Sequence, residues 1–404
     1  MEASIAALRF DSPTWCLLQV LPRLDSGGVE RTTVDIADAV VKAGGKAVVV
    51  SEGGEMEVDL QRAGAIHERL PVASKNPLVM RTNIKRLSQV IARHEVDIVH
   101  ARSRAPAWSA YYAAKRCERP FVTTFHGAYS RGVPLKQSYN AIMTKGRRVI
   151  ANSEYIGRHL REVYGVERER LRVIPRGVDL LRFDPQQVSV ARVIRLAEQW
   201  QLPDGVPVVM LPGRLTRWKG QHLVLEALEH LSDLDLIAAF VGGEQPGHAG
   251  YREELEQAIR DRGLIGRAQV LGHCDDMPAA YRLADVVVSA STDPEAFGRV
   301  ISEAQALGRP VVAADHGGAP EQILDGHTGK LFPPGDAKAL AEGIRWGLGL
   351  TPEQREILAM DALAHVRISF SKEQMCTRTL AVYAEVLGRA VTLDNRELDD
   401  HSVV

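Results

Sequence analysis

The sequence predicts an α/β protein made of two Rossmann-like doubly wound domains, each a parallel β-sheet with helices on both faces. Short apolar runs alternate with longer amphipathic stretches through most of the chain, an alternation typical of strands and helices in such a sheet. The alternation occurs twice, with a break near residue 185. A chain of 404 residues is also long enough for two or three domains rather than one.

The first series of predicted strands occupies the N-terminal half of the chain. Strands are expected at 14–21, 46–51, 66–70, 96–100 and 120–125. Amphipathic stretches separate these strands, and the first of them begins at about Val29. The pattern stops after VIPRGVDLLRFDP, residues 173–185. We therefore predict a first domain over residues 1–185.

The second series begins with VPVVML at 206–211, after a helical stretch at about 191–200. Further strands are expected at 234–242, 267–272, 285–290, 310–315 and 329–332, with a short helix between the last two. The segment 337–390 has the pattern of helices with no strand between them. The sequence therefore predicts a second domain over 186–370, a helix at 371–390 and a flexible acidic tail at 391–404.

The composition is that of a folded globular protein, with 25% charged and 45% hydrophobic residues. No run approaches the roughly 18 apolar residues that cross a bilayer, and the first residues lack a secretory signal, so a cytoplasmic location is expected. Four cysteines (Cys16, Cys117, Cys274 and Cys376) lie far apart without CxxC spacing. Buried free thiols are therefore expected, and neither disulfides nor a zinc site.

Charge is distributed unevenly along the chain. Residues 75–176 contain 21 Lys and Arg against 7 Asp and Glu, although the whole chain has a net charge of -1. The basic side chains include Arg102, Arg104, Lys115, Arg116, Arg119, Arg131, Lys136, Lys145, Arg147 and Arg148. A solvated surface would explain them, but contact with an anionic membrane or glycolipid is the more specific hypothesis. Nucleic acid is not expected as a partner, because the segment has no recognisable nucleic-acid-binding motif.

Ligands of doubly wound sheets bind beyond the carboxyl ends of the strands, so polar residues that follow strands are the candidates for a site. Gly27 and Gly28 stand where the first strand turns into a helix. Glycine lets the backbone approach a phosphate closely, and the helix N-terminus offers unpaired N–H groups. A tight turn would need glycine without any ligand. The GxGxxG signature is absent, which argues against a standard NAD site.

The first strand of the second series ends in LPGRLTRWKG, which contains Arg214 and Lys219. A helix is expected to start near Lys219, so both cations can reach the edge of the site. A diphosphate needs such partners, since Arg binds phosphate oxygens bidentately. The alternative is that they are two exposed cations among fifty Lys and Arg residues.

EAFGRVISE, residues 295–303, also follows a predicted strand. If the helix begins at about Gly298, Phe297 and Gly298 present free amides to an anion. Glu295 and Glu303 would then lie about two turns apart. Carboxylates are strong acceptors for pairs of hydroxyls, which suits a sugar or a ribose. Helix capping by Glu295 and a solvated Glu303 would be the structural explanation.

His126 ends the predicted strand at 120–125 and could polarise a substrate oxygen, although a lone histidine is as often structural. HGGAPEQI, residues 316–323, is predicted to be another turn from strand to helix, with Pro320 in the first helical position. Asp233 and Asp235 match the letters of a metal-binding DxD but precede a strand. They would lie at the opposite edge of the sheet, so no metal site is expected.

Five blocks taken together resemble glycosyltransferase family 4, whose members are retaining enzymes of the GT-B fold. They are the Gly27-Gly28 turn, VIPRGVDLLRFDP, PGRLTRWKG, LGHCDDMPAAY and EAFGRVISEAQALGRPVVAADHGGAPE, and they span about residues 15–335. The chain is most similar in character to bacterial lipopolysaccharide-core or glycolipid enzymes. The resemblance implies two domains facing an interdomain cleft, with the helix at 371–390 crossing back to the N-terminal domain.

The resemblance also implies roles for the candidate residues. Glu295 would hold hydroxyls of the donor sugar and Glu303 the nucleotide ribose. Arg214 and Lys219 would grip the diphosphate, and His126 would approach the donor sugar from the N-terminal domain. Backbone groups at Gly28, Phe297 and Gly298 would lie near the phosphates, and the loop containing Cys274, Asp276 and Met277 would hold the base.

The sequence departs from the family pattern at two places. Tyr129 lies in the run His126-Gly-Ala-Tyr129, where many relatives have an HDxH-like run. Arg176 stands in IPRGVD, where the phrase IPNGVD is frequent. This extra cation is expected to touch the acceptor or the domain interface.

The sequence thus predicts a retaining, metal-independent glycosyltransferase without a cofactor. It would move a hexosyl group from a UDP- or GDP-linked sugar to a hydroxyl of a cell-envelope saccharide or lipid, with peripheral attachment to the inner face of the cytoplasmic membrane. Two other functions remain open at this point. A nucleotide-sugar 2-epimerase of the same fold would need no acceptor, and a non-catalytic nucleotide-sugar or glycan-binding module would not consume the donor.

Overall fold

The computed structural model describes residues 8–10, 15–25, 27–129, 134–244, 250–389 and 391–393. The chain divides into two compact units, which we call unit 1 (Met1–Gly177 with Lys372–Val404) and unit 2 (Val178–Ser371). Each contains one large parallel sheet, as the sequence predicts. The division falls after Gly177, before the predicted position at residue 185, and the chain returns to unit 1 at Lys372.

The sheet of unit 1 has seven parallel strands in the order β4-β3-β2-β5-β6-β7-β8. They are β2 (Cys16–Val20), β3 (Lys46–Ser51), β4 (Ile66–Arg69), β5 (Ile98–Ala101), β6 (Phe121–Phe125), β7 (Arg148–Ala151) and β8 (Leu171–Val173). The first five correspond to the predicted strands. The last two were not predicted separately, because each has only three or four residues and follows a charged stretch.

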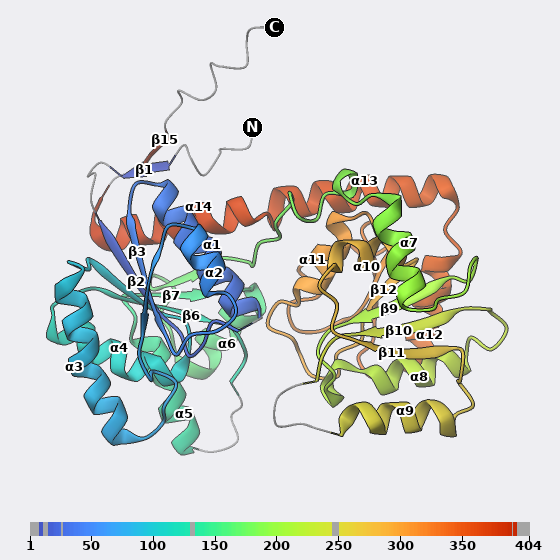
Figure 1. Ribbon diagram of the computed structural model, residues 1–404, viewed down its shortest axis with the longest axis horizontal. Helices are drawn as coiled ribbons and strands as arrows, with labels where there is room; N and C mark the ends of the chain where they lie inside the picture. The colour runs from blue at the N-terminus through green and yellow to red at the C-terminus, as the bar shows by residue number, and fades with distance from the viewer. Residues whose placement is uncertain are drawn as a thin grey trace, which may run out of the picture. The chain divides into compact units, whose positions relative to one another are not determined.

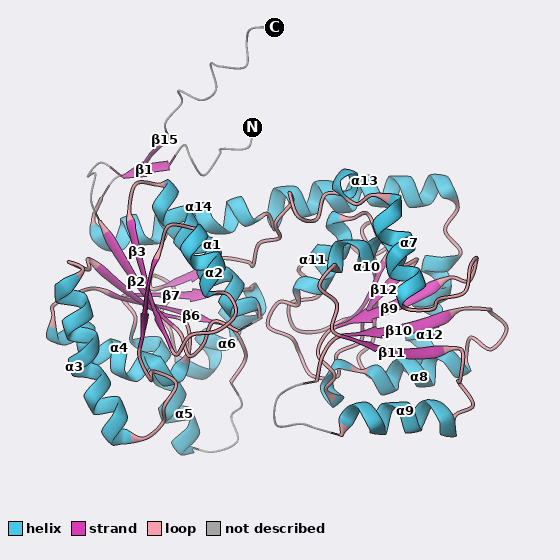
Figure 2. Ribbon diagram, in the orientation of Figure 1, coloured by secondary structure: helices cyan, strands magenta, loops and turns pink. Residues whose placement is uncertain are grey.

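Helices cover both faces of this sheet (Figure 2). They are α1 (Gly28–Lys42), α2 (Glu57–Arg62), α3 (Pro77–Arg93), α4 (Arg104–Arg116), α5 (Pro134–Asn140), α6 (Glu154–Tyr164) and α14 (Lys372–Leu387). Side-chain caps define two of their starts, since Asn76 accepts from the amide of Leu78 and Ser153 from the amide of Ile156. Gly165 ends α6 in the left-handed conformation.

The helix α14 belongs to unit 1 although it comes from the C-terminal end of the chain (Figure 1). It packs against α1, and its buried residues Met375, Leu380 and Tyr383 join the same hydrophobic cluster as Trp15 of the N-terminal segment. Beyond it, β15 (Val391–Leu393) pairs antiparallel with β1 (Leu8–Phe10). The remainder of the predicted tail, 394–404, lies outside the described residues.

The sheet of unit 2 has six parallel strands in the order β11-β10-β9-β12-β13-β14. They are β9 (Val208–Pro212), β10 (Ile237–Val241), β11 (Ala268–Gly272), β12 (Val286–Ser289), β13 (Val311–Ala314) and β14 (Lys330–Phe332). All six correspond to predicted strands. The short helix predicted before the last strand is absent, because residues 316–322 form turns and bends instead.

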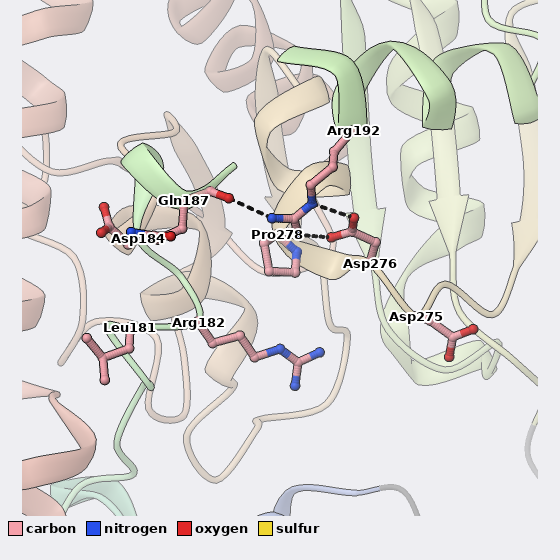
Figure 3. Close-up of a pocket in the computed structure, with 8 residues that line it drawn as sticks. All are labelled: Leu181, Arg182, Asp184, Gln187, Arg192, Asp275, Asp276 and Pro278. Atoms are coloured by element: carbon pink, nitrogen blue, oxygen red, sulfur yellow. Dashed lines mark hydrogen bonds and ion pairs between the residues drawn. The ribbon is translucent and has the colours of Figure 1, made fainter. Parts of the chain in front are cut away.

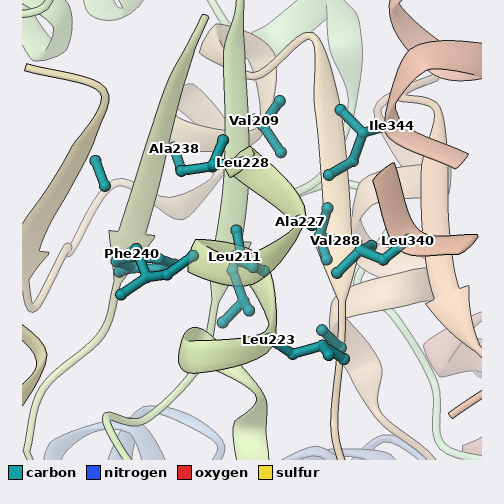
Figure 4. Packing of buried hydrophobic residues seen from close by; sticks show 14 of the residues in the cluster. Val209, Leu211, Leu223, Ala227, Leu228, Ala238, Phe240, Val288, Leu340 and Ile344 are labelled. Atoms are coloured by element: carbon teal, nitrogen blue, oxygen red, sulfur yellow. The ribbon is translucent and has the colours of Figure 1, made fainter. Parts of the chain in front are cut away.

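The helices of unit 2 again lie on both faces of the sheet. They are α7 (Val190–Gln199), α8 (Gln221–Glu229), α9 (Tyr251–Asp261), α10 (Met277–Leu283), α11 (Arg299–Ala306), α12 (Ala337–Leu348) and α13 (Pro352–Ser369). Side chains from β9, α8 and α12 form the core on one face, including Leu211, Leu228 and Ile344 (Figure 4). Burial of these apolar side chains fixes the strand ends on which the site depends.

Each sheet has a topological switch point at its first parallel strand, because later strands of the chain pair with both sides of that strand. Strand β2 lies between β3 and β5, and β9 lies between β10 and β12. Such a switch point opens a crevice beyond the carboxyl ends of the strands, where ligands of doubly wound sheets bind. Because all strands of each sheet are parallel, the segments after β6 and β12 begin at the same sheet edges as those after β2 and β9. These four segments are therefore the places to look for a site.

Two expectations from composition can be compared with the structure. In the described part of the chain, no helix is long and apolar enough to cross a membrane. All four cysteines are free, as predicted, but only Cys16 and Cys376 are buried. Cys117 and Cys274 are partly exposed, so the prediction of burial was wrong for these two.

Candidate active site

The segments after β9 and β12 meet through an ion pair in unit 2. Lys219 Nζ lies 2.6 Å from Glu295 Oε1, and the side chains are only 11% and 16% exposed. Ser291 Oγ donates to the same carboxylate oxygen. Lys219 also lies over the Trp218 ring, and its methylene groups pass close to Gly213 at the end of β9. The structure thus brings together two of the predicted catalytic residues.

A close approach between two backbones positions Lys219. Gly220 follows it with φ +81°, and a Cβ there would lie 1.9 Å from the carbonyl oxygen of Ala290. Only glycine fits this position, since the conformation and the space both exclude a side chain. The turn after β9 is therefore fixed against the end of β12.

The segment His316-Gly317-Gly318 packs against the loop that carries Glu295. The His316 imidazole Nε2 lies 2.7 Å from the Ser291 carbonyl oxygen, and the Gly318 amide donates to the Glu295 carbonyl at 2.9 Å. A Cβ at Gly317 would lie 2.4 Å from that same carbonyl oxygen. The prediction of a helix start at Pro320 was wrong, and the glycines serve close packing of two loops. Ser291 and His316 had not been singled out from the sequence.

The predicted anion-binding turn precedes α11. Gly298 has φ +79° and caps the helix, which begins at Arg299. The amides of Phe297 and Gly298 donate to none of the described residues. The Phe297 side chain is 2% exposed and anchors the turn in the core. Ser291, Glu295, Gly298 and His316 line one narrow pocket, so free amides and a carboxylate share this space.

Arg214 differs from Lys219 in its surroundings. Its side chain is exposed, and the guanidinium has no hydrogen-bond or ion-pair partner among the described residues. Its backbone carbonyl accepts a hydrogen bond from Gln221 Nε2 at 3.2 Å, which ties the turn to α8. An exposed, unpaired guanidinium next to the end of β9 is available to an anionic ligand without breaking an internal contact.

Glu303 lies in α11 and has its own partners. Tyr281 donates from its hydroxyl to Glu303 Oε2 at 2.9 Å, and Arg299 Nε lies 3.5 Å from Oε1. Burial and the neighbouring Glu303 carboxylate raise the pKa of Tyr281 well above its ordinary value. Tyr281 is therefore a donor that fixes the orientation of the Glu303 carboxylate. Tyr281 ends the motif LGHCDDMPAAY, but the sequence predicted no role for it.

The predicted base-binding loop borders a larger pocket. Asp276 caps α10 through the Ala279 amide, and it forms two hydrogen bonds with Arg192 at 2.9 and 2.6 Å. Arg192 holds the pKa of Asp276 below its ordinary value. These bonds occupy the Asp276 side chain, so its carboxylate is engaged within the protein.

The pocket beside this loop has a volume of about 630 Å³ and is drawn in Figure 3. Leu181 and Arg182 reach it from the loop after the chain enters unit 2, Asp275 lies in the predicted base-binding loop, and Pro278 lies in the first turn of α10. Figure 3 shows the Arg182 side chain extending into this space. LLRFDP was interpreted from the sequence only as part of a family motif. The sequence did not predict that Leu181 and Arg182 line a pocket.

In unit 1 the predicted residues Gly28 and His126 meet through Arg176. Arg176 Nη2 lies 2.9 Å from His126 Nδ1, and Nη1 donates to the Gly28 carbonyl and to Thr32 Oγ1. Arg176 is only 8% exposed. Burial, followed by the charge of Arg176, lowers the pKa of His126 well below its ordinary value. Both effects disfavour the imidazolium form.

Gly27 and Tyr129, the two other residues of unit 1 considered from the sequence, lie against neighbouring side chains. Gly27 precedes α1 with extended φ and ψ, and a Cβ there would meet the side chain of Glu30. Tyr129 packs against Phe125, and the Arg104 guanidinium lies 4.1 Å from its ring centroid. Burial raises the pKa of Tyr129 to about 12. A stacked, neutral phenol fits a supporting role beside His126.

Asp233 and Asp235 precede β10, as predicted, and Asp233 pairs with Arg345 on the surface. Among the described residues no three His, Cys, Asp or Glu side chains are grouped so that they could hold a metal ion. Of the basic residues, Lys115, Arg116 and Arg119 are exposed after or at the end of α4, whereas Arg102 is buried and bonds to Gln19. Arg131 lies outside the described residues.

Parallel sheets in both units, with polar side chains beyond the strand ends, define a GT-B protein, and solved glycosyltransferases of this class are similar to the chain. One is a glycosyltransferase from Rickettsia africae, with 36% identity, a TM-score of 0.85, and coverage of 93% of this chain and 99% of that one. Another is Alr3699/HepE from Anabaena in complex with UDP-glucose, with 26% identity, a TM-score of 0.81, and coverage of 92% and 99%.

Sequence comparison gives the family. The model of Glycosyltransferase Family 4 matches residues 26–182, and that of Glycosyl transferases group 1 matches residues 194–360. A D-inositol 3-phosphate glycosyltransferase from Xylanimonas cellulosilytica is 32% identical over 308 residues, which are 72% of this chain and 73% of the relative. The chain belongs to glycosyltransferase family 4 and is a glycosyltransferase.

Proposed function

We propose that the protein transfers a hexosyl group from a nucleotide diphosphate sugar to an acceptor hydroxyl, with retention at the anomeric carbon and without a metal ion. The pairing of Lys219 with Glu295 beside the free amides of Phe297 and Gly298 carries this proposal. A cation, two amides and a carboxylate match the phosphates and hydroxyls of one such donor. The complex of the Anabaena relative with UDP-glucose supports a donor of this type.

Different residues of unit 2 contact different parts of the donor in this proposal. Lys219 and the exposed Arg214 contact the diphosphate, and Glu295 accepts from sugar hydroxyls with the oxygen that Lys219 does not bind. Glu303, oriented by Tyr281, accepts from the ribose hydroxyls. The backbone between Cys274 and Met277 holds the base. UDP- and GDP-linked sugars both remain donors under this assignment.

The chemical step exchanges one bond at the anomeric carbon for another on the same face. The bond from C1 to the diphosphate oxygen breaks as the bond to the acceptor oxygen forms, and the acceptor proton passes to a departing phosphate oxygen. Negative charge grows on the leaving diphosphate, so Lys219 and Arg214 stabilise the transition state more than the ground state. No other group of the protein needs to accept the proton.

The acceptor is proposed to be an anionic cell-envelope saccharide or glycolipid. The support is the basic segment of unit 1, where Lys115, Arg116 and Arg119 are exposed, together with the exposed Leu78 of α3 and Tyr112 of α4. Exposed cations together with exposed apolar side chains suit the surface of an anionic membrane. The name of the Xylanimonas relative supports a second acceptor, a soluble phosphorylated polyol such as inositol phosphate.

The donor is tested first by thermal unfolding in the presence of UDP- and GDP-linked hexoses. A donor at 100 times its dissociation constant stabilises the protein by about 2.7 kcal/mol. The stabilising donor is then incubated with the enzyme alone, with inositol phosphate, or with lipopolysaccharide-core and glycolipid acceptors. NMR of the product should show the donor's anomeric configuration, with or without a chelator. A product of inverted configuration, or loss of activity with the chelator, would overturn the mechanism.

Membrane attachment has a separate test. Vesicles containing anionic lipid should sediment the protein at low salt and release it as salt is raised, because surface charge is screened. Neutral vesicles serve as the control. Sedimentation that depends on neither lipid charge nor salt would rule out the electrostatic part of the proposal. Activity on a soluble polyol alone, with no vesicle binding, would replace the glycolipid acceptor.

A further inference from the structure

Arg176 is a buried cation that no established role of the fold requires. It follows β8, is 8% exposed, and has its guanidinium between two segments of unit 1. One edge donates to the Gly28 carbonyl and Thr32 Oγ1 in the first turns of α1. The other edge lies 2.9 Å from the imidazole Nδ1 of His126, after β6. The guanidinium therefore has a fixed position and direction.

This contact determines which nitrogen of His126 carries the proton. A guanidinium has five N–H donors, no acceptor, and keeps its charge in proteins. The Nδ1 atom of His126 must therefore accept with its lone pair. A neutral imidazole has one N–H group, so that group is at Nε2. Protonation of Nδ1 would place two donors against each other and is opposed by Arg176.

The charged groups around His126 also disfavour protonation of its ring. Arg102 and His100 approach from β5 and its end, and together with Arg176 they disfavour an imidazolium. The pKa of His126 lies well below its ordinary value, with burial as the largest cause. Glu30 of α1 is a carboxyl group that lies close to Arg176. The neutral form with Nε2–H is thus favoured by geometry and by charge.

The Nε2 atom itself is buried and has no hydrogen-bond partner among the described residues. A buried N–H group without a partner is costly, and at a strand end it indicates a donor reserved for a ligand. His126 lies directly after β6, where the fold places ligands.

We propose that Arg176 is a positioning residue, which holds His126 as the neutral Nε2–H tautomer so that this N–H donates to an oxygen of the bound substrate. The inference rests on the proposed function for the identity of that substrate. It also explains the Arg in IPRGVD, because a guanidinium is long enough to join α1 to His126. An oxygen acceptor is required on the ligand, since Nε2–H can only donate.

Nitrogen NMR of the histidine rings tests this directly in the free protein. Long-range ¹H–¹⁵N spectra distinguish the two tautomers and the imidazolium, and His126→Gln identifies the signals. We expect a neutral Nε2–H ring between about pH 6 and 8, the range in which an ordinary histidine titrates. The same ring is expected in Arg176→Lys, which keeps a donor. In Arg176→Glu an acceptor faces Nδ1, so the ring should become Nδ1–H or doubly protonated.

Arg168→Glu is the matched control, since Arg168 is exposed on the same stretch of chain. It should leave the His126 spectrum unchanged. For turnover, Arg176→Lys should stay within about tenfold of wild type, and Arg176→Glu should lose about 100-fold or more, the scale of a lost preorganised donor. A wild-type ring with Nδ1–H would overturn the inference, even if Arg176→Glu failed to fold. So would an unchanged ring in a folded Arg176→Glu.

The spectra need no substrate, so the two proposals can fail separately. A neutral Nε2–H ring in a protein that transfers no sugar would leave the tautomer assignment standing and remove the proposed function. Sugar transfer by a protein whose His126 is Nδ1–H would do the opposite.

Discussion

Replacing Lys219 and Glu295 singly and together separates the structural from the catalytic contribution of their ion pair. The side chains are 11% and 16% exposed and 2.6 Å apart. Removing one partner of a fully buried pair costs about 3–5 kcal/mol, because the other charge is left uncompensated. These two keep some contact with water, so we expect about 2 kcal/mol for Lys219→Met and for Glu295→Gln.

The double variant removes both charges and keeps the volume of both side chains. It should be destabilised by only about 1 kcal/mol, because no buried charge remains without a partner. The coupling between the two sites is then about 3 kcal/mol, at the upper end for residues in direct contact. Urea unfolding followed by circular dichroism gives these values.

Turnover should not follow stability in this series. All three variants are expected to lose about 100-fold or more, because each lacks a group that contacts the donor. Arg214→Met offers a contrast, since its guanidinium is exposed and unpaired among the described residues. It should change stability by less than about 0.5 kcal/mol and still lose turnover. A double variant as unstable as the sum of the singles would refute the pairing, and turnover within threefold of wild type would refute the catalytic role.

Three further predictions concern stability. Gly220→Ala should cost about 3 kcal/mol or more and lower the melting temperature, since its Cβ would lie 1.9 Å from the Ala290 carbonyl oxygen; a melting temperature equal to wild type would contradict the close approach. Burial lowers the pKa of His100, so below about pH 6.5 the unfolded chain binds a proton at this residue that the folded protein does not bind. His100→Asn should therefore reduce the loss of stability on acidification by up to about 1.4 kcal/mol per pH unit. If the free energy of unfolding fell equally steeply with pH in the variant and the wild type, the prediction would be wrong. Glu385→Gln removes the charge of α14 that pairs with Arg148 at 2.6 Å and with Arg172 at 2.5 Å. It should cost about 1 kcal/mol in thermal unfolding, because the Glu385 side chain is one-third exposed; a melting temperature equal to wild type would contradict a stabilising role of these pairs.

The sequence was sufficient for the two sheets because their strands are buried on both faces. Runs such as KAVVVS at 46–51 have no polar face and stand out against the helices between them. Strands β7 and β8 were missed because RVIA and LRV are too short to show a period. The boundary near residue 185 was placed late, since the chain enters unit 2 inside the motif, at Val178, without any change in composition.

For the site, the sequence indicated residues that follow strands but not their mutual contacts. Lys219 and Glu295 are 76 positions apart, and no local pattern predicts that they form an ion pair. The contact of Arg176 with His126 spans 50 positions, so the departure from IPNGVD could be seen but not explained. His316 acts through a backbone carbonyl, which leaves no trace in the sequence.

The discontinuity of unit 1 has a consequence for biosynthesis. Its hydrophobic cluster includes Met375, Cys376, Leu380 and Tyr383, which a ribosome adds almost two hundred positions after Gly177. Unit 2 is a single uninterrupted stretch and can form while it emerges. The N-terminal sheet must wait for α14, so during elongation it presents an open apolar surface that chaperones would have to shield. Truncation ahead of Lys372 would make that exposure permanent.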